Sequence, residues 1–191
     1  MICHKHNFIY IHIPRTGGVS LEKVFHHRYP RHQTLSECVK RTTLECVQDY
    51  YKFTFVRNPW DKVVSWYFYH TGKLYRPRTK EGFADWVRGG MQHHWVNIDG
   101  TRWTGRDPLS CFEWLANDHE LSFDYIGRFE TYQEDFDTIC DNIGIPRVTL
   151  PHKNKSKHKH YSQYYDNETR DIVAEKYSKD LCEFGYVFER E

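Results

Sequence analysis

The segment that most constrains the fold of this chain is an apolar run that ends in a glycine-containing turn. Residues 8–13 are apolar or aromatic apart from His12, and they have the length of a buried strand. The turn at residues 14–18 follows, and residues 19 to about 27 have a helical pattern. Strand, glycine turn and helix in this order are typical of a loop that wraps phosphate, because glycines let backbone N–H groups approach an anion closely.

A cation and two hydroxyl groups in the same loop complete a cradle for a phosphate-bearing nucleotide. Arg15 supplies the positive charge, and Thr16 and Ser20 supply the hydroxyls. The loop differs from the G-x-x-x-x-G-K-[ST] pattern of nucleoside triphosphatases, because it has no Lys before the hydroxyl and only two adjacent glycines. This difference weakens an ATP or GTP interpretation and favours another phosphate-bearing nucleotide.

A second strand also ends in a polar turn. Residues 52–56 are aromatic or β-branched after Lys52 and predict a strand. Arg57 follows, and then Asn58 is placed as the N-cap and Pro59 as the first residue of a helix that runs to about His70. Because ligands bind α/β sheets at the carboxyl ends of strands, we expect both polar turns to face the ligand.

The remaining pattern predicts an α/β fold in which strands alternate with helices. Such alternation favours a central parallel sheet covered by helices on both faces, as in a three-layer sandwich. The expected further elements are helices at 34–48, around 83–87, 112–117, 132–143 and 166–180, and a strand at 123–129.

Length and charge narrow the classes of function. The 191 residues predict a single domain over residues 1–191. A net charge of +1 argues against nucleic acid as a partner. No run reaches the roughly 20 apolar residues of a membrane helix, and no signal peptide precedes the first strand. We therefore expect a soluble, cytoplasmic protein that binds no membrane, and the oligomeric state stays open.

The six cysteines are scattered along the chain, and none forms a C-x-x-C pair. We expect them to be reduced thiols, with disulfides as the alternative, and we expect no metal site.

Two segments together resemble the nucleotide-binding motifs of sulfotransferases. Residues 14–21 resemble the 5′-phosphosulfate loop, whose common form in the carbohydrate group is P-K-T-G-G-T-S. Residues 55–67 resemble the 3′-phosphate motif, R-N-P-x-x-R-x-x-S-x-Y. Further matches follow in order at residues 125–130, 154–156, 164–166 and 180–188, so the resemblance spans nearly the whole chain. It points to compact, soluble relatives of the carbohydrate sulfotransferases that include the heparan sulfate enzymes.

The resemblance implies a P-loop-like fold and a reaction. A sulfuryl group would move from 3′-phosphoadenosine 5′-phosphosulfate (PAPS) to an acceptor hydroxyl, with a carbohydrate as the preferred acceptor and adenosine 3′,5′-bisphosphate (PAP) as the product. It implies catalytic roles for Arg15, Ser20 and a histidine base, and no metal. The implied PAPS-binding residues are Pro14, Arg15, Thr16, Gly17, Gly18, Val19, Ser20, Arg57, Ser65, Lys153, Asn154 and Ser156.

The histidine base and the acceptor side are assigned with alternatives. His32 is the preferred base, since it lies between the first two helices where related enzymes carry one, and His93 or His94 is the alternative. Residues His93, His94, Trp95 and Arg102 are candidates for acceptor binding. The basic loop at residues 152–160 is too short, in a nearly neutral chain, to favour nucleic acid; closing over the donor or contacting an anionic glycan fits better.

Two departures from the family pattern leave rival functions open. Arg15 stands where the family usually has Lys, and Lys62 stands at the motif's second Arg. Arg keeps the positive charge but spreads it over a planar fork. The first rival is therefore a non-catalytic protein that binds nucleotide or glycan, and the second is a small-molecule kinase.

Overall fold

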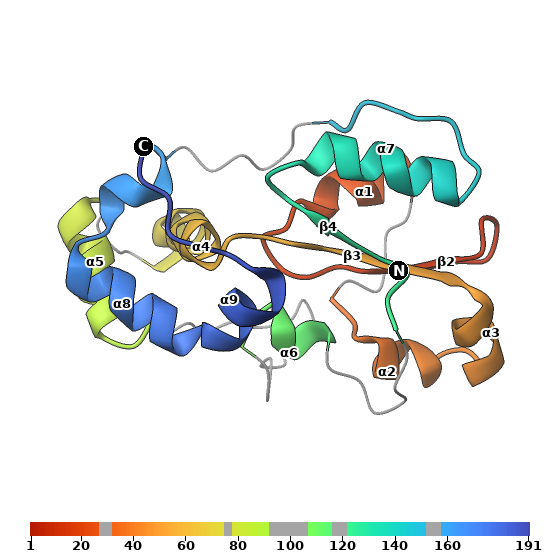
Figure 1. The fold of residues 1–191 in the computed structure, drawn as a ribbon, viewed down its shortest axis with the longest axis horizontal. Coiled ribbons are helices and arrows are strands. Elements are labelled where there is room, and N and C mark those ends of the chain that lie inside the picture. Colours follow the sequence, from red (N-terminus) through yellow and green to blue (C-terminus); the bar gives the residue numbers. More distant parts are fainter. Residues whose placement is uncertain (27–31, 75–77, 92–106, 116–121, 152–157) are drawn as a thin grey trace. The chain divides into compact units, whose positions relative to one another are not determined.

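The computed structural model describes residues 1–26, 32–74, 78–91, 107–115, 122–151 and 158–191 (Figure 1). They form two compact units, which are described separately. The first unit comprises residues 1–57 and 111–155, and the second comprises residues 58–110 and 156–191. The chain passes from the first unit to the second between Arg57 and Asn58. A single domain over residues 1–191 stays a prediction.

The first unit contains a four-stranded sheet in the order β1-β2-β3-β4. Its strands are β1 (Ile2–Cys3), β2 (Phe8–Ile11), β3 (Tyr51–Val56) and β4 (Tyr125–Arg128). The last three are parallel, with Ile11 opposite Thr54 and Val56 opposite Arg128. The short strand β1 pairs antiparallel with β2 at the edge. Parallel pairing brings the carboxyl ends of β2, β3 and β4 to one edge of the sheet.

Helices cover both faces of this sheet, which confirms the predicted α/β fold class (Figure 1). Helices α1 (Gly18–Val24) and α7 (Tyr132–Asn142) cover one face, and α2 (Leu35–Val39) and α3 (Leu44–Asp49) cover the other. A further short helix, α6 (Phe112–Leu115), belongs to the same unit. The buried core on the first face includes Phe8, Tyr10, Leu21, Phe53, Phe55, Phe136 and Ile139.

The sequence predicted one helix at residues 34–48, whereas the structure has two. Thr34 caps α2, since its Oγ1 accepts a hydrogen bond from the Glu37 amide at 3.3 Å and its own amide donates one to the Glu37 carboxylate. Thr43 caps α3 in the same way through the Cys46 amide. Each cap starts a new helix. The helical pattern of residues 34–48 did not reveal the break between the two helices.

The second unit is helical and rich in aromatic side chains. It contains α4 (Pro59–Leu74), α5 (Lys80–Arg88), the 3₁₀-helix η1 (Tyr161–Tyr164), α8 (Asn167–Lys176) and α9 (Ser178–Phe184). The predicted helix at 166–180 is thus divided, because Tyr177 leaves helical geometry with φ −108° and ψ 28°. Buried members of its core include Trp60, Trp66, Tyr67, Phe83, Trp86 and Tyr165.

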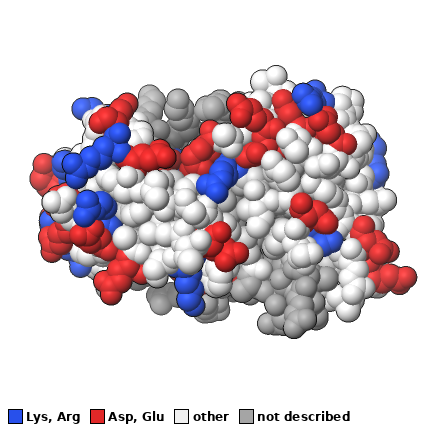
Figure 2. Space-filling view, viewed as in Figure 1, with Lys and Arg blue, Asp and Glu red and all other residues white. Residues whose placement is uncertain are grey.

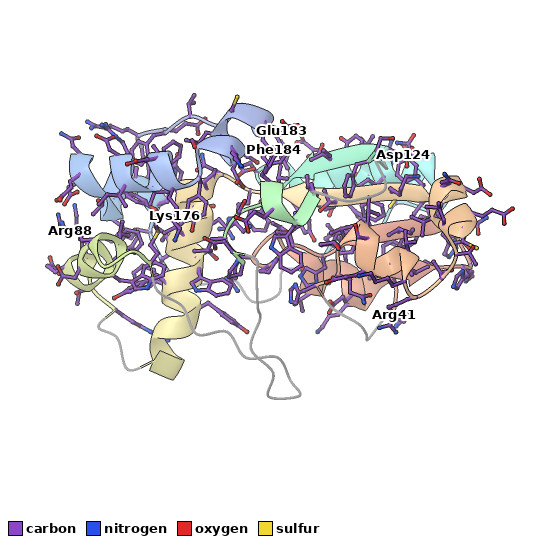
Figure 3. All side chains as sticks on the ribbon, turned by 90° about the horizontal axis from the view of Figure 1, so that it is seen from below. Arg41, Arg88, Asp124, Lys176, Glu183 and Phe184 are labelled. Carbon is purple, nitrogen blue, oxygen red and sulfur yellow. The ribbon has the colours of Figure 1, made fainter. Side chains whose placement is uncertain are left out.

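Charged side chains on the surface pair locally. Arg88, labelled in Figure 3, lies at the end of α5. It forms ion pairs with Asp166 at 2.6 Å and with Glu168 at 2.8 Å. On the face of the described residues shown in Figure 2, basic and acidic side chains are interspersed. None of the helices in the described ranges is both long and apolar enough to cross a membrane. The six cysteines, all of them described, are free thiols.

Candidate functional site

The turn after β2 has a backbone conformation suited to holding an anion. Arg15 has φ 64° and Gly17 has φ 87°, so two residues of the turn are left-handed. The Thr16 hydroxyl donates to the Ile13 carbonyl at 2.9 Å, and the Ser20 amide donates to the Gly17 carbonyl at 2.9 Å. Left-handed residues in a turn direct successive N–H groups into one concavity. A left-handed Arg costs about 1–3 kcal/mol and persists only where its surroundings hold it.

Both glycines are required by close neighbours. A Cβ added to Gly17 would lie 2.7 Å from Cζ of Tyr132, on α7. A Cβ added to Gly18 would overlap the ring of His12, at the end of β2. From the sequence alone, glycine at these two positions was explained only by anion binding. The structure adds that His12 and Tyr132 pack directly against the turn, which no local sequence signal shows.

Arg57 connects the turn after β3 to the turn after β2. Its side chain is buried, and its Nη1 donates to the Arg15 carbonyl at 3.0 Å. The Arg57 guanidinium also lies 4.1 Å from the ring centroid of Phe129, which follows β4. The Phe129 amide donates to the Val56 carbonyl at 2.8 Å and so continues the pairing of β3 with β4. Arg15, Arg57 and Phe129 follow three adjacent strands and therefore lie together. The sequence predicted this for the turns of Arg15 and Arg57.

The turn between β4 and α7 is fixed by one carboxylate. Asp135 accepts hydrogen bonds from the Tyr125 hydroxyl at 2.7 Å, the Arg128 amide at 2.6 Å and the Thr131 hydroxyl at 2.8 Å. These bonds set the start of α7 and hence the position of Tyr132 beneath Gly17. Burial, and then the charge of Glu22, raises the pKa of Tyr132 far above its ordinary value. The phenol therefore stays protonated at neutral pH.

Two histidines and a glutamate form a cluster behind the turn. His12 Nδ1 lies 2.9 Å from Oε1 of Glu22 on α1, and both side chains are buried. His32 Nδ1 lies 2.9 Å from the backbone carbonyl oxygen of His12. The two imidazole centroids are 4.3 Å apart. The sequence singled out His32 as the candidate base, and the contacts of His12 and Glu22 with this region come from the structure.

The other predicted site residues divide into three groups. Ser20 is buried on α1, and its hydroxyl donates to the Pro151 carbonyl at 2.6 Å. Ser65 is fully buried on α4, within the second unit. Pro14 is buried in the turn after β2, and Val19 is half-buried on α1. Seven further predicted contacts lie outside the described residues; they are His93, His94, Trp95, Arg102, Lys153, Asn154 and Ser156.

This arrangement can bind an anion and accept a proton. The turn offers N–H groups, and Arg15 and Arg57 bring positive charge to the same strand ends. His32 adds a titratable imidazole behind the turn. Within the described part of the chain, no group of three or more His, Cys, Asp or Glu side chains could hold a metal ion.

Comparison with known proteins assigns the chain to a family. A sequence model of the sulfotransferase family matches residues 1–187. An uncharacterized protein from Archaeoglobus fulgidus is 31% identical over 97 residues, which is 51% of this chain and 70% of that protein. No solved structure matches the chain. Because the family match covers almost the full length and includes both strand-end turns, this chain belongs to the sulfotransferase family.

Proposed function

We propose that this chain transfers a sulfuryl group from PAPS to an acceptor hydroxyl. The observation that carries the proposal is the hydrogen bond from Arg57 to the Arg15 carbonyl, which joins the two turns that resemble the 5′-phosphosulfate loop and the 3′-phosphate motif. A nucleotide with phosphate groups on both its 3′ and 5′ positions needs two such anion sites. Membership of the sulfotransferase family supports the reaction class.

The residues of the turn suit the donor. Glycine at positions 17 and 18 lets the turn pack tightly on Tyr132 and His12, and no other residue fits there without moving those side chains. When bound, PAPS supplies an activated sulfuryl group, whose sulfur–oxygen bond to the 5′-phosphate breaks as the acceptor oxygen bonds to sulfur. Arg15 would stabilise the negative charge that develops on the leaving phosphate, as a fixed cation beside the reacting group. Thr16 and Ser20 would add hydroxyl contacts by turning their protons from the Ile13 and Pro151 carbonyls toward the donor.

Arg57 and Ser65 would hold the 3′-phosphate. Arginine pairs with phosphate through two parallel charge-assisted hydrogen bonds, which are about twice as strong as neutral ones. Packing against Phe129 and donation to the Arg15 carbonyl leave the Arg57 guanidinium little freedom. A guanidinium that is already ordered loses less entropy on binding. Lys153, Asn154 and Ser156 stay proposed contacts of the same donor.

His32 would take the proton from the acceptor hydroxyl. A backbone carbonyl only accepts hydrogen bonds, so His32 Nδ1 must carry the proton that it shares with the His12 carbonyl. In the neutral ring, Nε2 is then the basic nitrogen. Removing the acceptor's proton as its oxygen attacks sulfur is worth about 10²–10⁴ in rate for a well-placed base. A carbohydrate acceptor, with His93, His94, Trp95 and Arg102 beside it, completes the proposal.

A non-catalytic nucleotide-binding role is the second candidate. It is favoured by one observation, that Arg15 takes the place of the family's usual Lys. Arg cannot donate a proton to the leaving oxygen, because it stays charged at any working pH. Such a protein would bind PAP through the same turns without turning over PAPS.

Calorimetry and a transfer assay together decide between these functions. We expect PAP to bind at least about 10-fold more tightly than ATP, which corresponds to about 1.4 kcal/mol. Equal affinities would contradict the donor assignment and favour a kinase. Transfer of labelled sulfate from PAPS across a panel of sugars, phenols and peptides should give a product with the wild type and with Arg15→Lys. If neither of them nor Arg15→Ala releases sulfate while PAP still binds, the non-catalytic role holds.

A further inference from the structure

We propose that Glu22 and His12 are positioning residues that hold His32 in one tautomer, with its proton on Nδ1 and its Nε2 ready to accept another. The catalytic meaning of this arrangement rests on the proposed sulfotransfer. The tautomer itself does not, and can be measured without any substrate.

The first step is the buried pair between Glu22 and His12. Their side chains are only 7% and 6% exposed, and Oε1 of Glu22 lies 2.9 Å from Nδ1 of His12. A carboxylate accepts hydrogen bonds, so His12 Nδ1 donates. Burying a carboxylate is costly unless it is paired, so the pair fixes the orientation of the His12 ring. Because Glu22 lies on α1 and His12 follows β2, the pair also ties together the two ends of the turn.

The second step is that His12 contacts His32 in two ways. Its backbone carbonyl accepts from His32 Nδ1 at 2.9 Å, and its ring lies 4.3 Å from the His32 ring, centroid to centroid, at an interplanar angle of 40°. Its ring also packs against Gly18, which limits how far the ring can turn. A change at Glu22 therefore reaches both the ring and the carbonyl that orient His32.

The third step is the backbone of His32. Its φ is 56°, a left-handed value that costs a non-glycine residue about 1–3 kcal/mol. The ring of Trp114, on α6, stands edge-on to that of His32 with centroids 6.2 Å apart. The His32 ring thus stands on a strained backbone and contacts a carbonyl, an imidazole and an indole, which fits a side chain whose orientation matters more than its contribution to stability.

Nitrogen NMR of the imidazole rings tests the inference directly. Long-range ¹H–¹⁵N spectra at about pH 8, above the ordinary titration range of histidine, distinguish the two neutral tautomers. In the wild type we expect His32 to show a protonated Nδ1 and an unprotonated Nε2. A protonated Nε2 would overturn the inference, and this measurement needs no variant.

Two substitutions at Glu22 then test the positioning role. Glu22→Leu removes the acceptor for His12 and should give a mixture of His32 tautomers, whereas Glu22→Gln keeps an acceptor oxygen and should largely preserve the wild-type tautomer. Glu134→Leu makes the same change at an exposed position of α7 and is the matched control. Thermal unfolding shows whether each variant is folded; if Glu22→Leu is not, the glutamine variant and the wild-type spectrum still decide. An unchanged tautomer in folded Glu22→Leu would overturn the inference.

Kinetics separate this inference from the proposed function. With an active acceptor, Glu22→Leu should lower kcat about 10- to 100-fold, part of the effect of a general base, and change the KM for PAPS less than 3-fold. Glu22→Gln should recover most of the lost kcat. A larger change in KM than in kcat would contradict the positioning role. If the tautomer responds to Glu22→Leu but no acceptor is ever sulfated, the inference stands and the proposed function fails.

Discussion

In the first unit, buried and half-buried polar side chains gather where the strands end, whereas in the second they join helix ends to loops. Thr16, Arg57 and His32 all donate to backbone carbonyls at the end of β2 or in the turn that follows it. In the second unit, Ser110 donates to Asp180 of α9 and Tyr177 donates to Asp107, so the bonds join helix ends to neighbouring loops.

This difference between the units indicates at which positions a substitution should affect ligand binding and at which it should affect stability. Hydrogen bonds to a turn hold strained backbone, such as that of Arg15, in a shape that a packed core does not need. Bonds that cap helices only add stability. We therefore expect substitutions at the strand ends of the first unit to lower ligand binding more than stability. Substitutions of helix-capping residues in the second unit, such as Asp166, should do the opposite.

The largest effect is expected for Gly17→Ala. The new methyl group would strike the Tyr132 ring, and the residue would keep a φ of 87° that alanine disfavours. The affinity for PAP should fall at least about 100-fold, or about 2.8 kcal/mol, as measured by calorimetry. Gly144→Ala is the matched control, since Gly144 also has a positive φ of 70° but open space around its Cβ position. If both variants bind PAP as the wild type does, the turn after β2 is not the anion site.

Arg57→Lys should have the next largest effect. Lysine keeps the charge but loses the planar fork and the bond to the Arg15 carbonyl. The affinity for PAP should fall about 10- to 100-fold, as for the loss of a charged hydrogen bond worth about 1.5–3 kcal/mol. The affinity for adenosine 5′-monophosphate, which lacks the 3′-phosphate, should change far less. Arg147→Lys, at the exposed ion pair with Asp141, is the control and should leave both affinities unchanged.

Phe129→Leu should have a smaller effect through Arg57. Leucine fills similar space but removes the ring that faces the guanidinium at 4.1 Å. A cation–π contact is worth about 0.5–2 kcal/mol, so the Kd for PAP should rise about 2- to 30-fold. Phe123→Leu, at a half-buried position before β4, is the control. Equal losses in both variants would show that general packing of this region, rather than the ring over Arg57, supports binding.

The sequence predicted those parts of the site that follow from local chemistry. The turn at residues 14–18 and the position of Arg57 after a strand were readable, because glycines, apolar runs and proline have strong local preferences. The contacts of Tyr132, Phe129 and Glu22 were not, since they depend on how α7, β4 and α1 pack together. The breaks within predicted helices 34–48 and 166–180 were missed where a threonine cap or a tyrosine outside helical geometry interrupts an otherwise helical pattern.

The smallest effect, and the one that completes the comparison, is expected for Asp166→Ala in the second unit. Asp166 caps α8 by accepting from the Thr169 amide at 2.7 Å, and its pKa is lowered by the hydrogen bonds from Thr169 and then by Arg88. A folded-state pKa below the unfolded value adds stability above the unfolded pKa, and this stability is lost as the pH falls through the folded pKa. Urea unfolding at neutral pH should show a loss of about 1 kcal/mol in Asp166→Ala, the usual cost of losing a cap, and the loss should shrink below about pH 4.

Asp171→Ala, at an exposed position of the same helix, is the control and should cost only a few tenths of a kcal/mol. PAP affinity should be unchanged in both variants; a 10-fold loss of affinity in Asp166→Ala would mean that the start of α8, too, takes part in binding the donor.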